Sequence, residues 1–132
     1  MQLNFNIFSI GSFFNHKDCI DIGLQSHLIY KFSCTQCVSE AYVGYTTRML
    51  RTRVAEHAGI SSRTGNPLLN PPQSSIRNHA EGCPVDINVD KFVILGKANH
   101  TIDQQILESL HIFRSRPSLN SSDSSFPLNI VK

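Results

Sequence analysis

The stretch from residue 27 to residue 57 constrains the fold most, because it holds two strand-like segments and one helical pattern within a short length. Leu28–Phe32 and Glu40–Tyr45 are rich in aromatic and β-branched residues, which is typical of β-strands. Seven residues separate them, a length that favours a hairpin with an enlarged tip. After Gly44 the apolar residues recur every three to four positions, which predicts a helix that ends near Gly59. The sequence therefore predicts a hairpin that leads directly into a helix.

This hairpin and helix carry four side chains that suit chemistry on a phosphodiester. Tyr30 and Tyr42 belong to the two predicted strands. Arg53 and His57 are four residues apart, so both project from one side of the predicted helix. Each tyrosine taken alone is more typical of strand packing, and a single histidine on a helix is more typical of a structural role. Together they bring two phenols, a guanidinium and an imidazole towards one region.

The rest of the chain predicts a loop, two helices and a strand. Residues 61–74 are rich in Ser, Pro, Gly and Asn, which indicates a loop. A short helix is expected at Ser75–Glu81, a strand with a buried apolar run at Asp90–Lys97, and a final helix from Ile102 to about Phe113. The apolar side of the final helix is expected to comprise Ile106, Leu107, Leu110 and Phe113.

The order β-β-α-α-β-α predicts an α+β domain with a small three-stranded sheet, mixed or antiparallel, flanked by helices. Residues 27–120 are expected to form this domain, after a poorly defined lead-in at 1–26 and before a tail at 121–132. Threonines are expected to cap the first and last helices: Thr46 or Thr47, and Thr101.

The distribution of charge is more informative than its sum. A net charge of +2 is too small to indicate a nucleic-acid-binding protein. Residues 41–80, however, contain five arginines and only one acidic residue, Glu56. Such a local excess would attract a phosphate backbone, although a solvated helix face is the ordinary alternative. The arginines are Arg48, Arg51, Arg53, Arg63 and Arg77.

Two pairs of potential metal ligands stand out. Cys34 and Cys37 form C-x2-C at the hairpin tip, and His79 and Cys83 form H-x3-C on the short helix. Both are usual half-sites for zinc. The alternatives are four unrelated residues or a Cys34–Cys37 disulfide, but cysteines in an intracellular protein favour metal or free thiols. Cys19 has no partner at metal spacing and is expected to be an unpaired thiol.

Membrane insertion is not expected from this sequence. There is no run of 18 apolar residues, so nothing predicts a membrane-spanning helix. The apolar residues near the start are interrupted by polar ones and no basic segment precedes them, so a secretory signal is not expected either. These features indicate an intracellular protein.

The motif residues resemble those of a known nuclease family. LIY at 28–30, followed by YVG at 42–44 and an arginine four residues before a histidine, resembles the GIY-YIG nuclease domain. Leu28 stands where the family name has Gly. The C-x2-C between the two tyrosine motifs, together with YVGYTTRMLRTRVAEH, is similar to the endonuclease domain of Penelope-like retroelements. The resemblance covers roughly residues 28–120 and implies the same β-β-α-α-β-α layout.

The resemblance also implies roles for five residues. One tyrosine would take the proton from the attacking water; we favour Tyr30 for this, with Tyr42 orienting the water or the phosphate. A free phenol, with a pKa near ~10, needs a neighbouring cation for that role. Arg53 would bind the scissile phosphate through its planar donors, and His57 would relay a proton or hold a phosphate oxygen. Glu108 would bind Mg²⁺.

The final helix and the segment after it supply the remaining candidates. Glu108, followed by Ile112, repeats the E-x3-I pattern of the family's metal-binding helix. A carboxylate among apolar residues is costly unless it binds metal or a cation, and Arg114 is the alternative partner. Asn120 matches an asparagine that the family often carries near its site, with Asn129 as the rival.

These observations predict a DNA endonuclease of retroelement origin that nicks DNA with one Mg²⁺ and contains a structural zinc. Arg48 and Arg51 would contact the nucleic acid. The resemblance implies nuclear localisation and a reverse transcriptase domain in the parent element. The alternative is a zinc-stabilised nucleic-acid-binding module that has lost cleavage. A structure-specific repair nuclease of the same fold is a third possibility, which the C-x2-C in the hairpin disfavours.

Overall fold

A three-stranded antiparallel sheet forms the centre of the molecule. The computed structural model describes residues 20–37 and 39–120. The strands are β1 (Leu28–Ser33), β2 (Ala41–Thr46) and β3 (Phe92–Lys97), and their order in the sheet is β2-β1-β3. The predicted α+β class with three strands flanked by helices is therefore confirmed, and the sheet is purely antiparallel.

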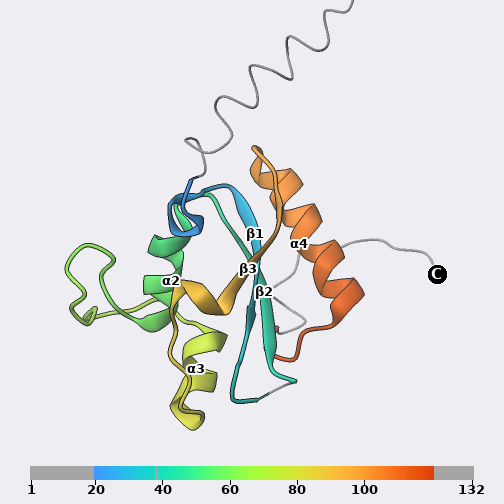
Figure 1. Cartoon of the computed structure of the whole chain (residues 1–132). Helices are drawn as coiled ribbons and strands as arrows, with labels where there is room; N and C mark the ends of the chain where they lie inside the picture. Colours follow the sequence, from blue (N-terminus) through green and yellow to red (C-terminus); the bar gives the residue numbers. More distant parts are fainter. Residues whose placement is uncertain (1–19, 38, 121–132) are drawn as a thin grey trace, which may run out of the picture.

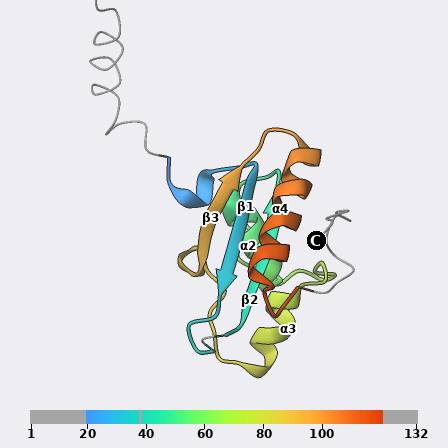
Figure 2. The ribbon, with the colours of Figure 1, turned by 90° about the vertical axis from the view of Figure 1, so that its right-hand side faces the viewer.

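Helices cover both faces of this sheet. The helices α2 (Leu50–Ala58) and α3 (Ser75–Gly82) lie on one face, and α4 (Thr101–Ser115) lies on the other, as Figures 1 and 2 show from two directions. Two short 3-10 turns, η1 (Ile22–Leu24) and η2 (Val89–Lys91), complete the described elements. The layout separates residues on the α2 face from those on the α4 face.

The alternation of β1 explains how the main core forms. Leu28, Tyr30 and Phe32 are fully buried and belong to the cluster that includes side chains of α2 and α3. Leu50 and Ile76 are the fully buried contributions of those two helices. Successive strand residues point to opposite faces, so these three side chains share one face of the sheet.

The α4 helix is turned differently from the prediction. Leu110 and Phe113 were expected on its buried side, but each is 44% exposed. The buried residues of α4 are polar: Gln104, Glu108 and Ser109. The expected apolar run in β3 is likewise only partly buried, because β3 is an edge strand and Val93 is 57% exposed. The prediction for α4 was wrong at Leu110 and Phe113, and the prediction for β3 is confirmed only for Phe92, which is 3% exposed. An apolar pattern does not by itself say which face meets the sheet.

The predicted helix caps were also wrong. Met49 is the N-cap of α2 and makes no side-chain cap hydrogen bond, and His100 rather than Thr101 precedes α4. Thr46 belongs to β2, and its Oγ1 accepts the backbone N–H two residues later. Thr46 is thus the last residue of β2, and Thr47 lies in the connection between β2 and α2.

The described structure includes residues upstream of the predicted domain start at residue 27. The η1 turn packs against α2, and the backbone N–H of Leu50 donates to the carbonyl of Gln25 at 2.8 Å. Cys19, Asn129 and the tail at 121–132 lie outside the described residues. Among the residues that are described, no helix has the length and apolar character needed to cross a bilayer.

Candidate active site and metal centre

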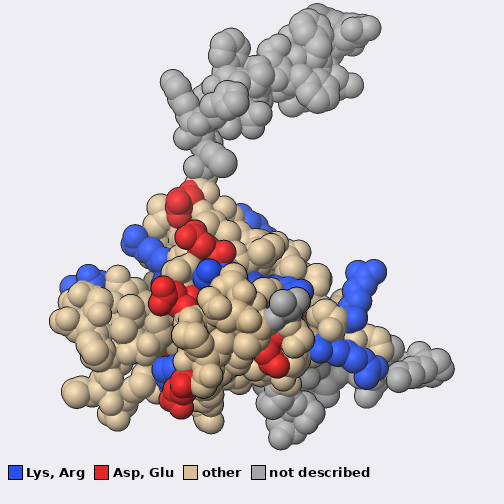
Figure 3. All heavy atoms as spheres, turned by 60° about the horizontal axis from the view of Figure 1, so that its bottom comes forward, with Lys and Arg blue, Asp and Glu red and all other residues tan. Residues whose placement is uncertain are grey.

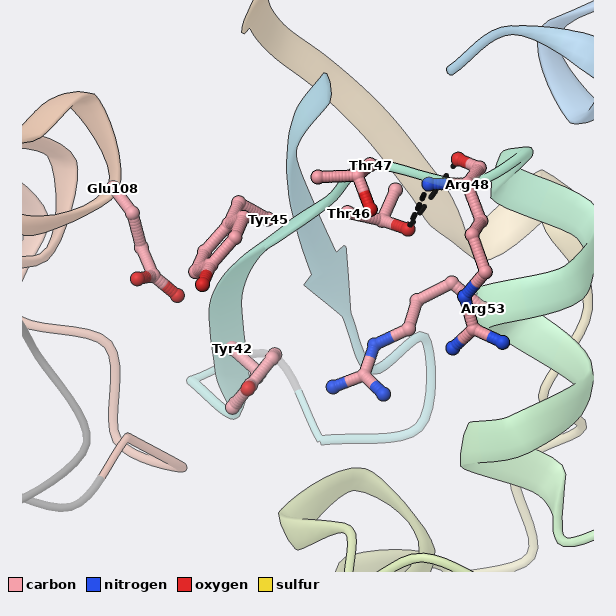
Figure 4. A pocket seen from close by; sticks show the side chains of 7 residues that line it. All are labelled: Tyr42, Tyr45, Thr46, Thr47, Arg48, Arg53 and Glu108. Atoms are coloured by element: carbon pink, nitrogen blue, oxygen red, sulfur yellow. Dashed lines mark hydrogen bonds between the residues drawn. The ribbon is translucent and has the colours of Figure 1, made fainter. Parts of the chain in front are cut away.

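A pocket of about 350 Å³ lies at the edge strand β2, between α2 and α4. Figure 4 shows the side chains that converge on it from the strand, the following turn and both helices. Three of the five residues to which the resemblance gives roles line it: Tyr42, Arg53 and Glu108. The other lining residues are Tyr45, Thr46, Thr47 and Arg48.

Glu108 presents a buried carboxylate to this pocket without a cationic partner in contact. Glu108 is only 6% exposed, and Figure 4 shows its side chain directed from α4 towards β2. Within residues 20–37 and 39–120 it makes neither a hydrogen bond nor an ion pair, so the alternative pairing with Arg114 is not seen. Burial raises the pKa of Glu108 to about 7, although Arg53 lowers it. Such a carboxylate is suited to binding a cation.

The guanidinium of Arg53 is held by two groups. Its Nε donates to the Tyr30 hydroxyl at 3.1 Å, and its Nη1 donates to Glu56 Oε2 at 3.0 Å. The second N–H of Nη1 and the two N–H groups of Nη2 are the donors that remain for an anion in the pocket. These contacts fix the position of Arg53 while it still lines the pocket.

Glu56 also binds Arg48, so it offsets part of the positive charge that the sequence places here. The Arg48 side chain lines the pocket and forms an ion pair with Glu56. Arg51 is exposed on the same helix and does not line the pocket. On the face shown in Figure 3, basic and acidic side chains are interspersed rather than gathered into one basic patch.

Tyr30 and His57 lie behind the pocket rather than in its lining. Tyr30 is fully buried and His57 is 2% exposed. The Tyr30 hydroxyl lies 2.8 Å from His57 Nε2, and His57 Nδ1 lies 2.7 Å from Ser74 Oγ. A chain of hydrogen bonds therefore runs from Arg53 at the pocket through Tyr30 and His57 to Ser74.

Burial keeps the two tyrosines and His57 in their neutral forms. It raises the pKa of Tyr30 well above its ordinary value, although Arg53 lowers it. Burial likewise raises the pKa of Tyr42, against the charge of Arg53. Burial lowers the pKa of His57 to about 3, and the nearby positive charges of Arg53 and Arg77 lower it further. At neutral pH both phenols keep their protons and the imidazole is uncharged.

A second cluster lies at the tip of the hairpin. Cys34 and Cys37 meet His79 and Cys83, and their ligand atoms all lie within 4.8 Å of one another. The sulfur of Cys83 is 3.7 Å from that of Cys34 and 3.4 Å from that of Cys37. His79 Nε2 is buried without a hydrogen-bond partner in the described structure. These four residues could therefore hold one metal ion, as the two half-sites predict.

Asn120 clamps the chain onto β2 and does not line the pocket. Its side chain accepts from the Val43 N–H and donates to the Val43 carbonyl, both at 2.8 Å. The neighbouring Leu119 N–H donates to the Ala41 carbonyl at 2.9 Å. The amide of Asn120 thus makes the two backbone hydrogen bonds that a neighbouring strand would make with Val43. Asn120 supports β2 beside Tyr42 and does not contact the pocket.

Several residues of the site were not singled out from the sequence. Tyr45, Thr46 and Thr47 line the pocket, and Glu56 orients two arginines. Ser74 was recognisable only as a polar residue before a helix, the usual position of an N-cap. No sequence signal connects it with His57, 17 residues earlier.

Comparison with known proteins does not extend these observations, since the chain matches no protein-family model, no curated protein and no solved structure. The resemblance to GIY-YIG nucleases therefore depends on the motif residues themselves. Their spatial arrangement is the basis of the proposal that follows.

Proposed function

We propose that this chain is a metal-dependent DNA endonuclease of the GIY-YIG type, similar to the endonuclease domain of Penelope-like retroelements. The observation that carries the proposal is the convergence of Tyr42, Arg53 and Glu108 on one pocket from three different elements. A phosphodiester needs a cation on its oxygens, a metal near the leaving group and a group that accepts a proton. Arg53 would supply the cation, Glu108 would hold the metal and Tyr42 would accept the proton.

Arg53 is the proposed phosphate-binding residue. Its Nε and one Nη are occupied by Tyr30 and Glu56, so the guanidinium is oriented before a substrate arrives. Negative charge grows on the phosphoryl oxygens in the transition state, where a fixed donor is most effective. Arg48, exposed at the rim of the same pocket, is suited to the adjacent backbone phosphates, and Arg51 to more distant ones.

Tyr42 is the better-placed phenol to meet the attacking water. It lines the pocket, whereas Tyr30, which the sequence favoured as the base, is fully buried behind it. Burial raises the pKa of Tyr42 and the charge of Arg53 offsets this rise only in part, so loss of the Tyr42 proton would also need the positive charge of the bound metal. In this arrangement Tyr30 connects Arg53 to His57 and orients the guanidinium.

Glu108 is the proposed ligand for Mg²⁺. Among the described residues no basic side chain contacts this buried carboxylate, which lines the pocket and is suited to binding an ion. Mg²⁺ binds proteins through one or two carboxylates and keeps several waters, so one glutamate is a sufficient protein ligand. When bound there, the ion would stabilise the negative charge of the leaving oxygen.

Zinc is the proposed occupant of the second cluster. Three cysteines and one histidine form the closed four-ligand set of a structural zinc site. The site joins the hairpin tip to α3 at Cys83, so its role would be to hold that helix against the sheet. It contains no ligand from the pocket and would take no direct part in cleavage.

The test of this proposal is nicking of supercoiled plasmid by the purified chain with and without Mg²⁺. Conversion to the relaxed circle only in the presence of Mg²⁺ is the expected result. A protein that retards the plasmid in a gel without relaxing it would instead be the zinc-stabilised binding module. Relaxation that continues in excess chelator would exclude the proposed role of Mg²⁺.

A further inference from the structure

We propose that Ser74 is the positioning residue of His57, and that it fixes the imidazole as the tautomer protonated on Nδ1. The inference deepens the proposed nuclease function, because His57 supports the phenol that orients Arg53. It rests on a contact between two elements that the sequence gives no reason to connect, the loop before α3 and the α2 helix.

The hydroxyl of Ser74 makes two contacts, one with its own helix and one with α2. It is the N-cap of α3, with extended backbone, and its Oγ accepts the backbone N–H of Arg77 at 3.3 Å. The same Oγ lies 2.7 Å from His57 Nδ1. The residue is 5% exposed, so water has little access to this contact. A single hydroxyl therefore joins the start of α3 to the imidazole on α2.

The donors around the neutral imidazole leave two arrangements. With its pKa lowered to about 3 by burial, the ring carries one N–H at neutral pH. In the first, the Tyr30 hydroxyl donates to Nε2 and Nδ1–H donates to the Ser74 oxygen. In the second, the Ser74 hydroxyl donates to Nδ1 and Nε2–H donates to the Tyr30 oxygen. In the reverse case the Tyr30 proton would need a different acceptor.

Burial decides between these arrangements. Tyr30 is fully buried, and its oxygen already accepts the Arg53 Nε–H. In the described residues its only other hydrogen-bond partner is His57 Nε2. A buried donor without an acceptor is destabilising. When Nδ1–H donates to Ser74, the Ser74 oxygen accepts from both Arg77 and His57 through its two lone pairs, and its own hydrogen has no protein acceptor among the described residues. Ser74 is 5% exposed whereas Tyr30 is fully buried, so an O–H group without a protein acceptor costs less at Ser74 than at Tyr30. Tyr30 therefore donates to Nε2, and Nδ1–H donates to Ser74.

This arrangement gives each residue a defined role. His57 Nε2 accepts the hydrogen bond of Tyr30, and the opposite ring nitrogen is oriented by Ser74, much as a third group orients the base in catalytic triads. At its other end α3 carries His79 and is followed by Cys83, both in the metal cluster. Ser74 is consequently held on a helix that is anchored at both ends.

Nitrogen NMR of the protein labelled in its histidine rings tests the inference, with His57→Gln used to assign the signals. The wild type should show His57 protonated on Nδ1 alone. Ser74→Gly removes the hydroxyl and weakens the helix cap only slightly, so the variant should fold and show a mixture of tautomers. Ser74→Thr keeps both functions of the hydroxyl and should restore the wild-type signals.

A wild-type ring protonated on Nε2, or unchanged ring signals in a folded Ser74→Gly protein, would overturn the proposal. If Ser74→Gly does not fold, the tautomer of His57 in the wild type alone decides whether the proposal holds. The measurement requires no cleavage, so its failure is distinguishable from failure of the nuclease assignment. In an active enzyme, Ser74→Gly should also slow nicking roughly tenfold to a hundredfold, as removal of an outer partner of a functional histidine does, and Ser74→Thr should recover it.

Discussion

Gly44 pairs with Tyr30 across the β1–β2 ladder, and a Cβ at position 44 would lie 2.7 Å from the Tyr30 hydroxyl oxygen. The same Cβ would lie 2.8 Å from Cε1 of Tyr42. The glycine is therefore needed for space: both phenols of the motif occupy the volume that any side chain at 44 would take. Tyr30 cannot easily move aside, because it is fully buried and held by His57 and Arg53.

Gly44→Ala should consequently destabilise the fold by about 1–3 kcal/mol, the usual cost of overpacking a core. Gly96→Ala is the matched control, because Gly96 also lies in a strand and a Cβ there meets nothing within 4 Å. Urea unfolding of both variants measures the difference. Equal stability of the two variants would contradict the account of the Tyr30 environment.

The metal cluster predicts one zinc ion per chain, lost when a ligand is removed. Cys83→Ser should lower the zinc content of the purified protein to near zero, because three remaining ligands hold the ion much less tightly. Cys19→Ser, in a cysteine without a partner at metal spacing, should keep the wild-type content. Elemental analysis of the three proteins decides, and zinc retained by Cys83→Ser would refute the four-ligand site.

His57 predicts a loss of stability in mild acid. Its pKa is lowered from 6.5 to about 3 in the fold, so below pH 6.5 the unfolded chain binds a proton that the folded chain refuses. The contribution of neutral His57 to the free energy of unfolding is complete above pH 6.5. It falls as the pH drops towards 3, by up to about 1.4 kcal/mol per pH unit. The advantage of the wild type over His57→Gln in unfolding free energy should therefore shrink between pH 7 and pH 5. A difference that stays constant would contradict the burial of a neutral imidazole.

Two arginines on one helix offer a test of the phosphate-binding role. Arg53→Ala should slow single-turnover nicking by a factor of about 10²–10³, as loss of one fixed transition-state donor does. Arg51→Ala, at an exposed position that does not line the pocket, should weaken DNA binding and leave the single-turnover rate at saturation unchanged. Similar rate losses in the two variants would remove the distinction between contact at the reacting phosphate and general attraction.

The sequence was sufficient for the elements and for the metal ligands because those signals are local. Strand composition located β1 and β2, and the helix that follows ends at Gly59, which has the left-handed φ of 76° expected of a helix stop. Cys34 and His79 come together because half-sites of usual spacing sit on a hairpin tip and a helix. The structure differs little from these predictions.

The orientation of α4 could not be predicted in the same way. Its sequence has an apolar side, with Leu110 and Phe113, and a more polar side, with Gln104 and Glu108, and periodicity alone favours burial of the apolar one. The polar side meets the sheet because Gln104 donates to the Ala98 carbonyl at 2.7 Å and Glu108 faces the pocket. A helix that turns a buried amide and a buried carboxylate towards the sheet departs from the usual pattern for that reason.

The division between pocket and supporting residues also required the structure. Tyr30 and Tyr42 are equivalent in the motif, but their register positions differ: Tyr30 faces Gly44, and Tyr42 faces Phe32. Only Tyr42, on the edge strand, reaches the pocket. Strand order is a long-range property, which short motifs do not encode.

The central claim is that Glu108 holds the metal ion required for cleavage. The most direct measurement is Mg²⁺-dependent nicking of supercoiled plasmid by Glu108→Ala beside the wild type, with circular dichroism and zinc content recorded for both. The account predicts that Glu108→Ala is folded, contains wild-type zinc and does not nick at any Mg²⁺ concentration at which the wild type does. Undiminished nicking by the folded variant would contradict the account.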